Sequence, residues 1–369
     1  MEVVLPTFSH AGADDVAAEV SVAQSAALPR ERVILALIVT WIAVGLAIDT
    51  RRHRTDRSLD TFFTSAHGVL YAGWVAAAVF LLYVVRTRQV KGAKGWSAVP
   101  VGFEAVVVGV ALFGIGGIGD MIWHTEFGIE QDLKILFSPT HLFLMTAMIM
   151  ISFGAVRSLW LSHDDATVRN LWPALLSSGV IISVLLVFFQ FASAFDRGIF
   201  TTVVPDVFRL NEIVRVQSIS GVVIMTVIFF APLQLLASRW VLPIGTATLA
   251  FCVPAASNFI FTDFKSTRLS IAVVAGGVVV DAVWFGLRRL CPRHDRLMYR
   301  LFGALAPFMF WCTYLGISII GKHMQWPAEM WTGTLIWSAL IGAGITALLL
   351  PPRNTPTSWL ETAANQSSR

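Results

Sequence analysis

Two segments of this chain each combine one aspartate with two histidines at similar spacings. Each segment reads Asp-x-x-x-His, then a polar loop, then Phe-x-x-x-His and an apolar run. The six residues are Asp49, His53 and His67 in the first segment, and Asp120, His124 and His141 in the second. Imidazole nitrogens and carboxylate oxygens are ligands for copper, iron or zinc, so each segment is a candidate metal site.

The spacing predicts how each segment gathers its three side chains. An Asp-x-x-x-His pair lies on one face of a helix, about one turn apart. In both segments this pair ends one apolar run, and the second histidine begins the next. Thr64 before His67, and Ser138 with Pro139 before His141, are typical of helix N-termini. A helical hairpin therefore brings a carboxylate and two imidazoles together at one end.

The expected position of each aspartate calls for a compensating positive charge. A carboxylate at a helix C-terminus faces the negative end of the helix dipole, at a cost of about 0.3–1 kcal/mol. Desolvation near hydrocarbon adds to that cost. A metal ion would supply the charge. The alternative for Asp49 is an interfacial anchor in which Arg51, Arg52 or Arg54 pairs with it.

Four further polar residues are expected at the same membrane face. Glu126 and Glu130 make the loop of the second segment acidic and are candidates for outer partners of its ligands. His323 and Glu329 lie in a later loop on that face, where they either complete a site or are ordinary loop residues.

The rest of the chain is strongly apolar. Hydrophobic residues make up 56% of its 369 residues, charged residues 14%, and the mean hydropathy is +0.71. Soluble domains carry about 25% charged residues, so an integral membrane protein is predicted. Runs long enough to cross about 30 Å of hydrocarbon indicate an all-α, polytopic transmembrane helix bundle. We place ten spans at roughly 33–49, 66–85, 101–123, 139–158, 172–194, 216–236, 241–261, 269–287, 301–320 and 331–350.

Three regions divide the chain. Polar tails are expected at residues 1–30 and 351–369, on either side of a transmembrane domain at 31–350. Within that domain the hairpins at about 33–85 and 101–158 run in the same direction and form a predicted parallel repeat. Glu104 and Asp281 are the carboxylates expected within or at the edge of a span, which makes them functional candidates.

Charge distribution predicts the orientation and the partners. Lys and Arg are more frequent in the tails and even-numbered loops than in the odd-numbered loops. Both termini are therefore expected in the cytoplasm, with the metal segments on the outer side of the cell (inner) membrane. Cytoplasmic loops account for the net charge of +4, so the expected partner is the lipid bilayer and not nucleic acid. Three cysteines without a Cys-x-x-Cys pair argue against a thiolate metal site.

Both segments resemble metal-binding helices of a known enzyme family. The pattern of an Asp or Asn, a His one helical turn later and a second His beyond a loop is similar to the membrane subunit of the copper-dependent monooxygenases of the particulate methane and ammonia type. The resemblance covers the two hairpins alone and implies copper ligands at the six residues. The ten-span layout and the acidic second loop differ from that family. The stretch from Asp120 to Glu130, with Ser138-Pro-x-His141-Leu, also resembles a recurrent family of bacterial polytopic membrane proteins, which implies no activity.

Three candidate functions are considered for these aspartates and histidines. The first is a membrane metalloprotein, with copper favoured over iron or zinc, that acts as an oxidoreductase on an apolar small molecule. The second is a metal-ion or proton-coupled transporter, although transporter sites usually lie near the middle of the membrane. The third, a b-type cytochrome, would need His53 and His67 on one helix, and the polar residues between them cannot cross lipid.

Overall fold

The computed structural model describes residues 25–56, 62–129, 134–162, 164, 167–195, 208–291, 295–321 and 326–350. Every named element within these ranges is helical, which confirms the predicted all-α bundle. The helices are α2 (Pro29–Thr55), α3 (Ser65–Val90), η2 (Gly95–Ala98), α4 (Glu104–Phe127), α5 (Lys134–Phe137), α6 (Pro139–Leu161), α7 (Val168–Phe188), η3 (Gln190–Ala192), α9 (Phe208–Arg239), α10 (Thr246–Phe261), α11 (Thr267–Leu290), α12 (Asp295–Ile320) and α13 (Ala328–Leu349).

Nine helices of the described ranges are long and apolar enough to cross a membrane. They match nine of the ten predicted spans. The tenth, predicted at 241–261, is the shorter helix α10, which has 16 residues. Its start was predicted too early, because Pro243 lies in a turn and Gly245 before the helix has a φ of 92°. That backbone conformation favours glycine and interrupts the helical path.

The carboxylates of Asp281 and Glu104 each accept backbone hydrogen bonds near the start of a helix. The carboxylate of Asp281, on α11, accepts the backbone N–H groups of Ala247 and Thr248 at 3.0 Å each, and the Thr248 hydroxyl at 2.6 Å. It therefore caps α10 from the neighbouring helix and satisfies donors that a helix start leaves open. Glu104 accepts a backbone N–H just before α4 and lies 3.7 Å from Arg157. Structural roles account for both carboxylates.

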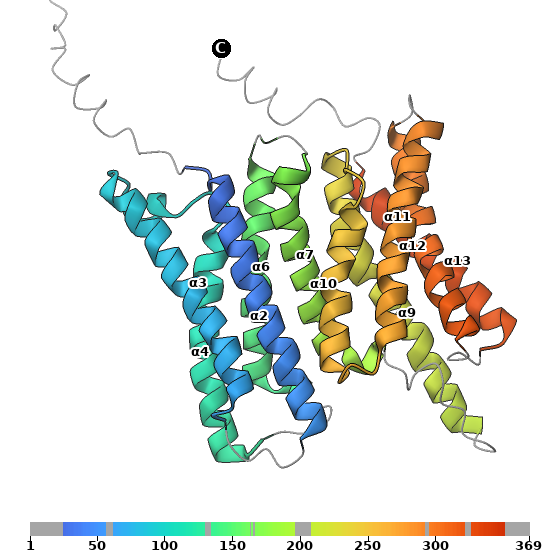
Figure 1. Cartoon of the computed structure of the whole chain (residues 1–369), viewed down its shortest axis with the longest axis horizontal. Coiled ribbons are helices and arrows are strands. Elements are labelled where there is room, and N and C mark those ends of the chain that lie inside the picture. The colour runs from blue at the N-terminus through green and yellow to red at the C-terminus, as the bar shows by residue number, and fades with distance from the viewer. Residues whose placement is uncertain are drawn as a thin grey trace, which may run out of the picture.

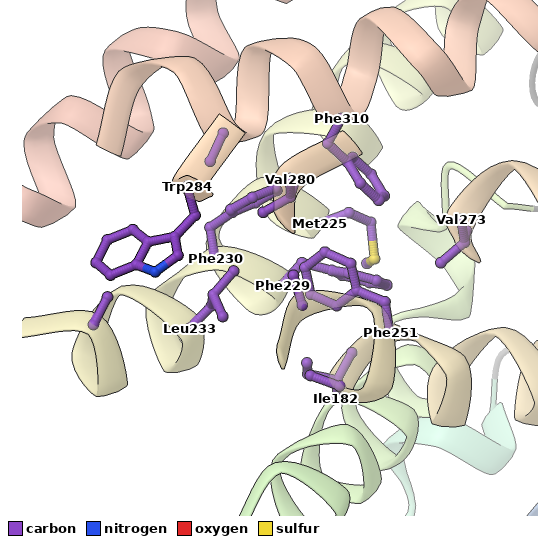
Figure 2. Close-up of a cluster of buried hydrophobic side chains, with 14 of the residues drawn as sticks. Ile182, Met225, Phe229, Phe230, Leu233, Phe251, Val273, Val280, Trp284 and Phe310 are labelled. Atoms are coloured by element: carbon purple, nitrogen blue, oxygen red, sulfur yellow. The ribbon is translucent and has the colours of Figure 1, made fainter. Parts of the chain in front are cut away.

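The helices pack in two groups that share α7 (Figure 1). One hydrophobic cluster lies mainly among α2, α3, α4 and α6, and a larger one mainly among α9 to α12. Different residues of α7 enter the two clusters, so this helix joins the groups. Aromatic rings fill the larger cluster, where Phe229, Phe251 and Phe310 face one another at centroid distances of 4.9–5.7 Å (Figure 2).

The two hairpins, α2–α3 and α4–α6, turn at the same end of the molecule, the lower end in Figure 1. Close helix packing holds each hairpin. A Cβ added at Gly45 would lie 2.7 Å from the backbone of Leu70, so α2 and α3 approach closely only because residue 45 is glycine. The ends of four helices that carry the predicted metal ligands are thereby brought to one end of the bundle.

Candidate metal centre

The first Asp/His/His group joins the end of α2 to the start of α3. Asp49 and His53 lie one turn apart near the end of α2, with Asp49 Oδ2 3.8 Å from His53 Nε2. His67, in the first turn of α3, points its Nε2 at the other carboxylate oxygen, Oδ1, at 3.4 Å. The Thr64 hydroxyl accepts the backbone N–H of His67 at 3.1 Å, which confirms the predicted cap.

The second group repeats this arrangement between α4 and α6. Asp120 Oδ1 lies 3.5 Å from His124 Nε2, one turn along α4, and 3.3 Å from His141 Nε2 in the first turn of α6. Ser138 is the residue before α6 and Pro139 begins it, as predicted. The second group is more deeply buried, since the Asp120 and His124 side chains are 2% and 1% exposed.

The distances within both groups suit a shared metal ion. In each group the three ligand atoms lie within 4.8 Å of one another. Direct hydrogen bonds from nitrogen to oxygen are usually about 2.7–3.2 Å long. Two ligands of a tetrahedral ion with bonds of about 2.0–2.1 Å lie about 3.3–3.4 Å apart. The four Asp–His distances, from 3.3 to 3.8 Å, therefore match a chelated ion better than direct hydrogen bonds.

The other ring nitrogen of three histidines is held by the chain. His67 Nδ1 donates to the carbonyl of Phe62 at 2.5 Å, and His124 Nδ1 faces the carbonyl of Gly128 at 3.3 Å. His141 Nδ1 lies 2.6 Å from the Ser138 hydroxyl. A carbonyl partner requires the proton on Nδ1, which leaves the Nε2 lone pair of His67 and His124 directed into its group.

One ligand atom of the second group has no hydrogen-bond partner within the described residues. His124 Nε2 is fully buried and makes no hydrogen bond there. A buried polar atom without a partner costs about 1–3 kcal/mol, so its place beside Asp120 calls for an additional group. A hydrogen bond of 2.9 Å from the Thr140 hydroxyl holds the Asp120 oxygen that faces both histidines. The carboxylate is thus oriented toward the point where an ion would lie.

Among the described residues, none of the three arginines considered as a partner of Asp49 pairs with it. Arg51 donates to Asp263 at 2.8 Å and lies over the Phe264 ring, while Arg52 pairs with Asp56 at 3.2 Å. Arg54 donates to a glutamine, Gln190, on η3. Among the described residues the ion pairs of Asp49 involve its two histidines and no arginine.

The two groups are neighbours, which the sequence did not indicate. The rings of His67 and His124, one from each group, have centroids 6.4 Å apart. Phe62 stacks on His67 at 4.8 Å and lies 6.1 Å from His124. Tyr71 lies one turn beyond His67 on α3, with ring centroids 6.2 Å apart. Sequence reasoning missed Phe62 and Tyr71, although the one-turn spacing of Tyr71 from His67 was a usable signal.

The four predicted accessory residues lie apart from the groups or outside the described ranges. Glu126 is exposed near the end of α4 and contributes no atom to either group. Glu329 is exposed at the start of α13, a helix that packs on α9 and α12 in the other part of the bundle. Glu130 and His323 lie outside the described residues. The groups that do support the ligands are Thr140, Ser138 and two backbone carbonyls.

Comparisons with known proteins give no match for this chain, whether among family models, curated proteins or solved structures. The two family resemblances therefore stay predictions. The protein is a membrane-type helical bundle with two buried Asp/His/His groups suited to hold metal ions, a description that rests on distances, burial and hydrogen bonds.

Proposed function

We propose that this integral membrane protein binds two transition-metal ions, one in each Asp/His/His group, and uses them for redox chemistry on an apolar substrate. The observation that carries the proposal is the buried, unpartnered Nε2 of His124 beside the oriented carboxylate of Asp120. An ion there would satisfy the nitrogen and neutralise the carboxylate together. The first group has the same ligand types in the same order along its hairpin.

Copper is the favoured metal, ahead of iron and zinc. Imidazole ligands suit all three, and copper(II) binds a given nitrogen and oxygen site most tightly among the common divalent ions. Three protein ligands leave at least one coordination position open, as in metal sites that perform catalysis. An apolar substrate fits a centre enclosed by helices of high hydropathy, because such a molecule concentrates in the bilayer that surrounds them.

The position of the groups favours a metalloprotein over a transporter. All six ligands lie in the last turns of α2 and α4 or the first turn of α3 and α6. Transporter sites usually lie near the membrane midplane on interrupted helices, which allows access from both sides in turn. We also propose that both termini face the cytoplasm and that the groups open to the outer side of the inner membrane, as the charge bias predicts.

Elemental mass spectrometry of detergent-purified protein tests the proposal directly. The wild type is expected to hold about two ions per chain, one for each three-ligand group. The His124→Ala/His141→Ala and His53→Ala/His67→Ala variants are each expected to lose one. Glu329→Gln, an exposed carboxylate outside both groups, is the matched control and should leave the metal content unchanged. A wild type that binds no metal after reconstitution, while correctly folded, would refute the proposal.

The redox part of the proposal needs a second measurement. Copper-loaded wild type should show a copper(II) electron paramagnetic resonance signal that a chemical reductant removes and air restores. The copper per chain that the reductant converts to copper(I), measured with a copper(I) chelator, should fall by about half in either double-histidine variant, since one of two sites remains. A metal-loaded protein whose ions cannot be reduced would leave metal binding in place and exclude the oxidoreductase.

A further inference from the structure

Tyr71 carries a second buried polar atom without a partner in the described part of the chain, its hydroxyl oxygen. The ring is packed between Phe62, at 5.8 Å, and Phe113, at 5.5 Å. A tyrosine hydroxyl both donates and accepts hydrogen bonds, and buried hydroxyls nearly always have a partner. A phenylalanine would fill the same apolar space without leaving a buried hydroxyl unsatisfied.

The Tyr71 side chain lies near both metal groups. Its oxygen faces α4 one turn before Asp120, where a Cβ at Gly117 would lie 3.0 Å away. The ring also contacts His67 of the first group, with centroids 6.2 Å apart, and His67 itself lies beside His124 of the second. The Tyr71 side chain thus packs against both His67 of the first group and the turn of α4 before Asp120 of the second.

Gly117 provides the space in which this hydroxyl sits. It lies on α4, one turn before Asp120, and a Cβ there would be 2.6 Å from Cε1 of Tyr71 and 3.0 Å from its oxygen. Any larger residue at position 117 would displace the ring, because both contacts are shorter than van der Waals distances. The close approach directs the hydroxyl against α4 near the second group rather than into lipid.

Charge favours an anion as the missing partner. Two divalent ions would bring four positive charges to a cluster with two carboxylates, which leaves an excess that a small anion can balance. A pocket of about 310 Å³ opens between the end of α2 and the start of α3, and its lining includes the sequence neighbours of Asp49 and His67, Ile48 and Ala66. Its two arginines pair with Asp263 and Asp56, so the charge that would hold an anion comes from the proposed ions.

The geometry points to a binding site for a small anion of the hydroxide class between the two Asp/His/His groups, with the Tyr71 hydroxyl as its hydrogen-bond donor. The site rests on the proposed function, since the two metal ions supply the charge that holds the anion. The ions would supply positive charge and open coordination positions, and Tyr71 would donate its hydroxyl proton to the anion at the boundary between the groups. Tyr71 is in this sense a ligand-binding residue rather than a metal ligand.

Azide binding to the cobalt-loaded, full-length protein tests this site. Cobalt(II) replaces the native metal as a probe, its content is measured per chain, and azide is titrated while visible absorption is recorded. Tyr71→Phe should bind azide about tenfold more weakly, the loss expected for one hydrogen bond to a charged acceptor. Tyr83→Phe, an exposed position on the same helix, is the control and should match the wild type. Cobalt content should be the same in all three proteins.

The outcomes separate this inference from the proposed function. Equal azide affinity in wild type and Tyr71→Phe would overturn the role of Tyr71. Cobalt-loaded wild type that shows no response to azide would overturn the anion site while metal binding stands. Failure of the wild type to bind cobalt, copper or iron would remove the proposed function, and the anion site with it.

Discussion

The two parts of this bundle differ in how the polar atoms of their buried rings are partnered. In the part built from α9 to α13, buried aromatic side chains satisfy their polar atoms locally. The Trp311 indole donates to Thr226 at 2.8 Å, and the Tyr314 hydroxyl donates to the carbonyl of Ala194 at 2.8 Å. Such pairs let large rings fill the core without a polar penalty, so this part of the bundle is organised for packing.

The part built from α2 to α6 leaves comparable atoms unsatisfied. His124 Nε2 and the Tyr71 hydroxyl are buried and unpartnered within the described residues, and both lie in the same cluster. Proteins rarely retain such atoms unless something else binds them. The amide oxygens of Gln234 and Asn258 in α9 and α10 also lack a hydrogen-bond partner in the described ranges, so the difference concerns the rings alone. It teaches where our proposal places a ligand: at the hairpins, whose buried ring atoms are open, and not among the paired rings of the aromatic part.

The largest expected effect is on stability, in the aromatic part. Phe310 is fully buried and contacts Phe229, Phe230 and Phe251. Phe310→Ala should lower the free energy of unfolding by about 3–5 kcal/mol, because it removes apolar contacts and leaves a cavity. Chemical denaturation in detergent measures the loss. Metal content of the protein that remains folded should be unchanged, and a variant that loses metal without losing stability would contradict the division between the parts.

A smaller effect is expected on metal affinity when a supporting group is removed. Thr140→Val keeps the side-chain shape but deletes the hydroxyl that donates to Asp120. Loss of such an outer partner typically weakens metal binding by about 10- to 100-fold. Competition with a chelator measures this change. Thr146→Val, on the exposed face of the same helix, removes a hydroxyl bonded only to its own helix and should not alter the affinity.

The smallest predicted effect is on the stability of the metal-free protein. His124→Leu substitutes hydrocarbon for a buried nitrogen that lacks a hydrogen-bond partner in the described part of the chain, but it also removes the Nδ1 contact with the Gly128 carbonyl. The two effects oppose each other, so the free energy of unfolding of the metal-free protein should change by less than about 1 kcal/mol, while the metal of the second group is lost. Thermal unfolding of the metal-free wild type and variant compares them. A clear loss of stability in the metal-free variant would show that His124 has a packing role instead.

Much of this structure follows from local sequence signals, and the rest depends on contacts between distant segments. Apolar length predicted nine of the long helices, and helix spacing placed each Asp-x-x-x-His pair on one face with its second histidine on the next helix. The nearness of the two groups could not be predicted, because it depends on how α3 packs beside α4. The cap that Asp281 provides for α10 is equally non-local, since the two residues it serves lie more than thirty positions earlier.

The short helix α10 has a consequence for the depth at which it begins. Sixteen residues rise about 24 Å, some 6 Å less than the hydrocarbon thickness of a typical bilayer. Neighbouring helices cover most of α10, so the mismatch is met within the protein, with one end of the helix below the headgroups. At such depth water is scarce, and open N–H groups at a helix start would be costly. The Asp281 carboxylate from α11 accepts hydrogen bonds from these groups and removes that cost. The first turn of α10 can therefore lie inside the hydrocarbon without water to cap it.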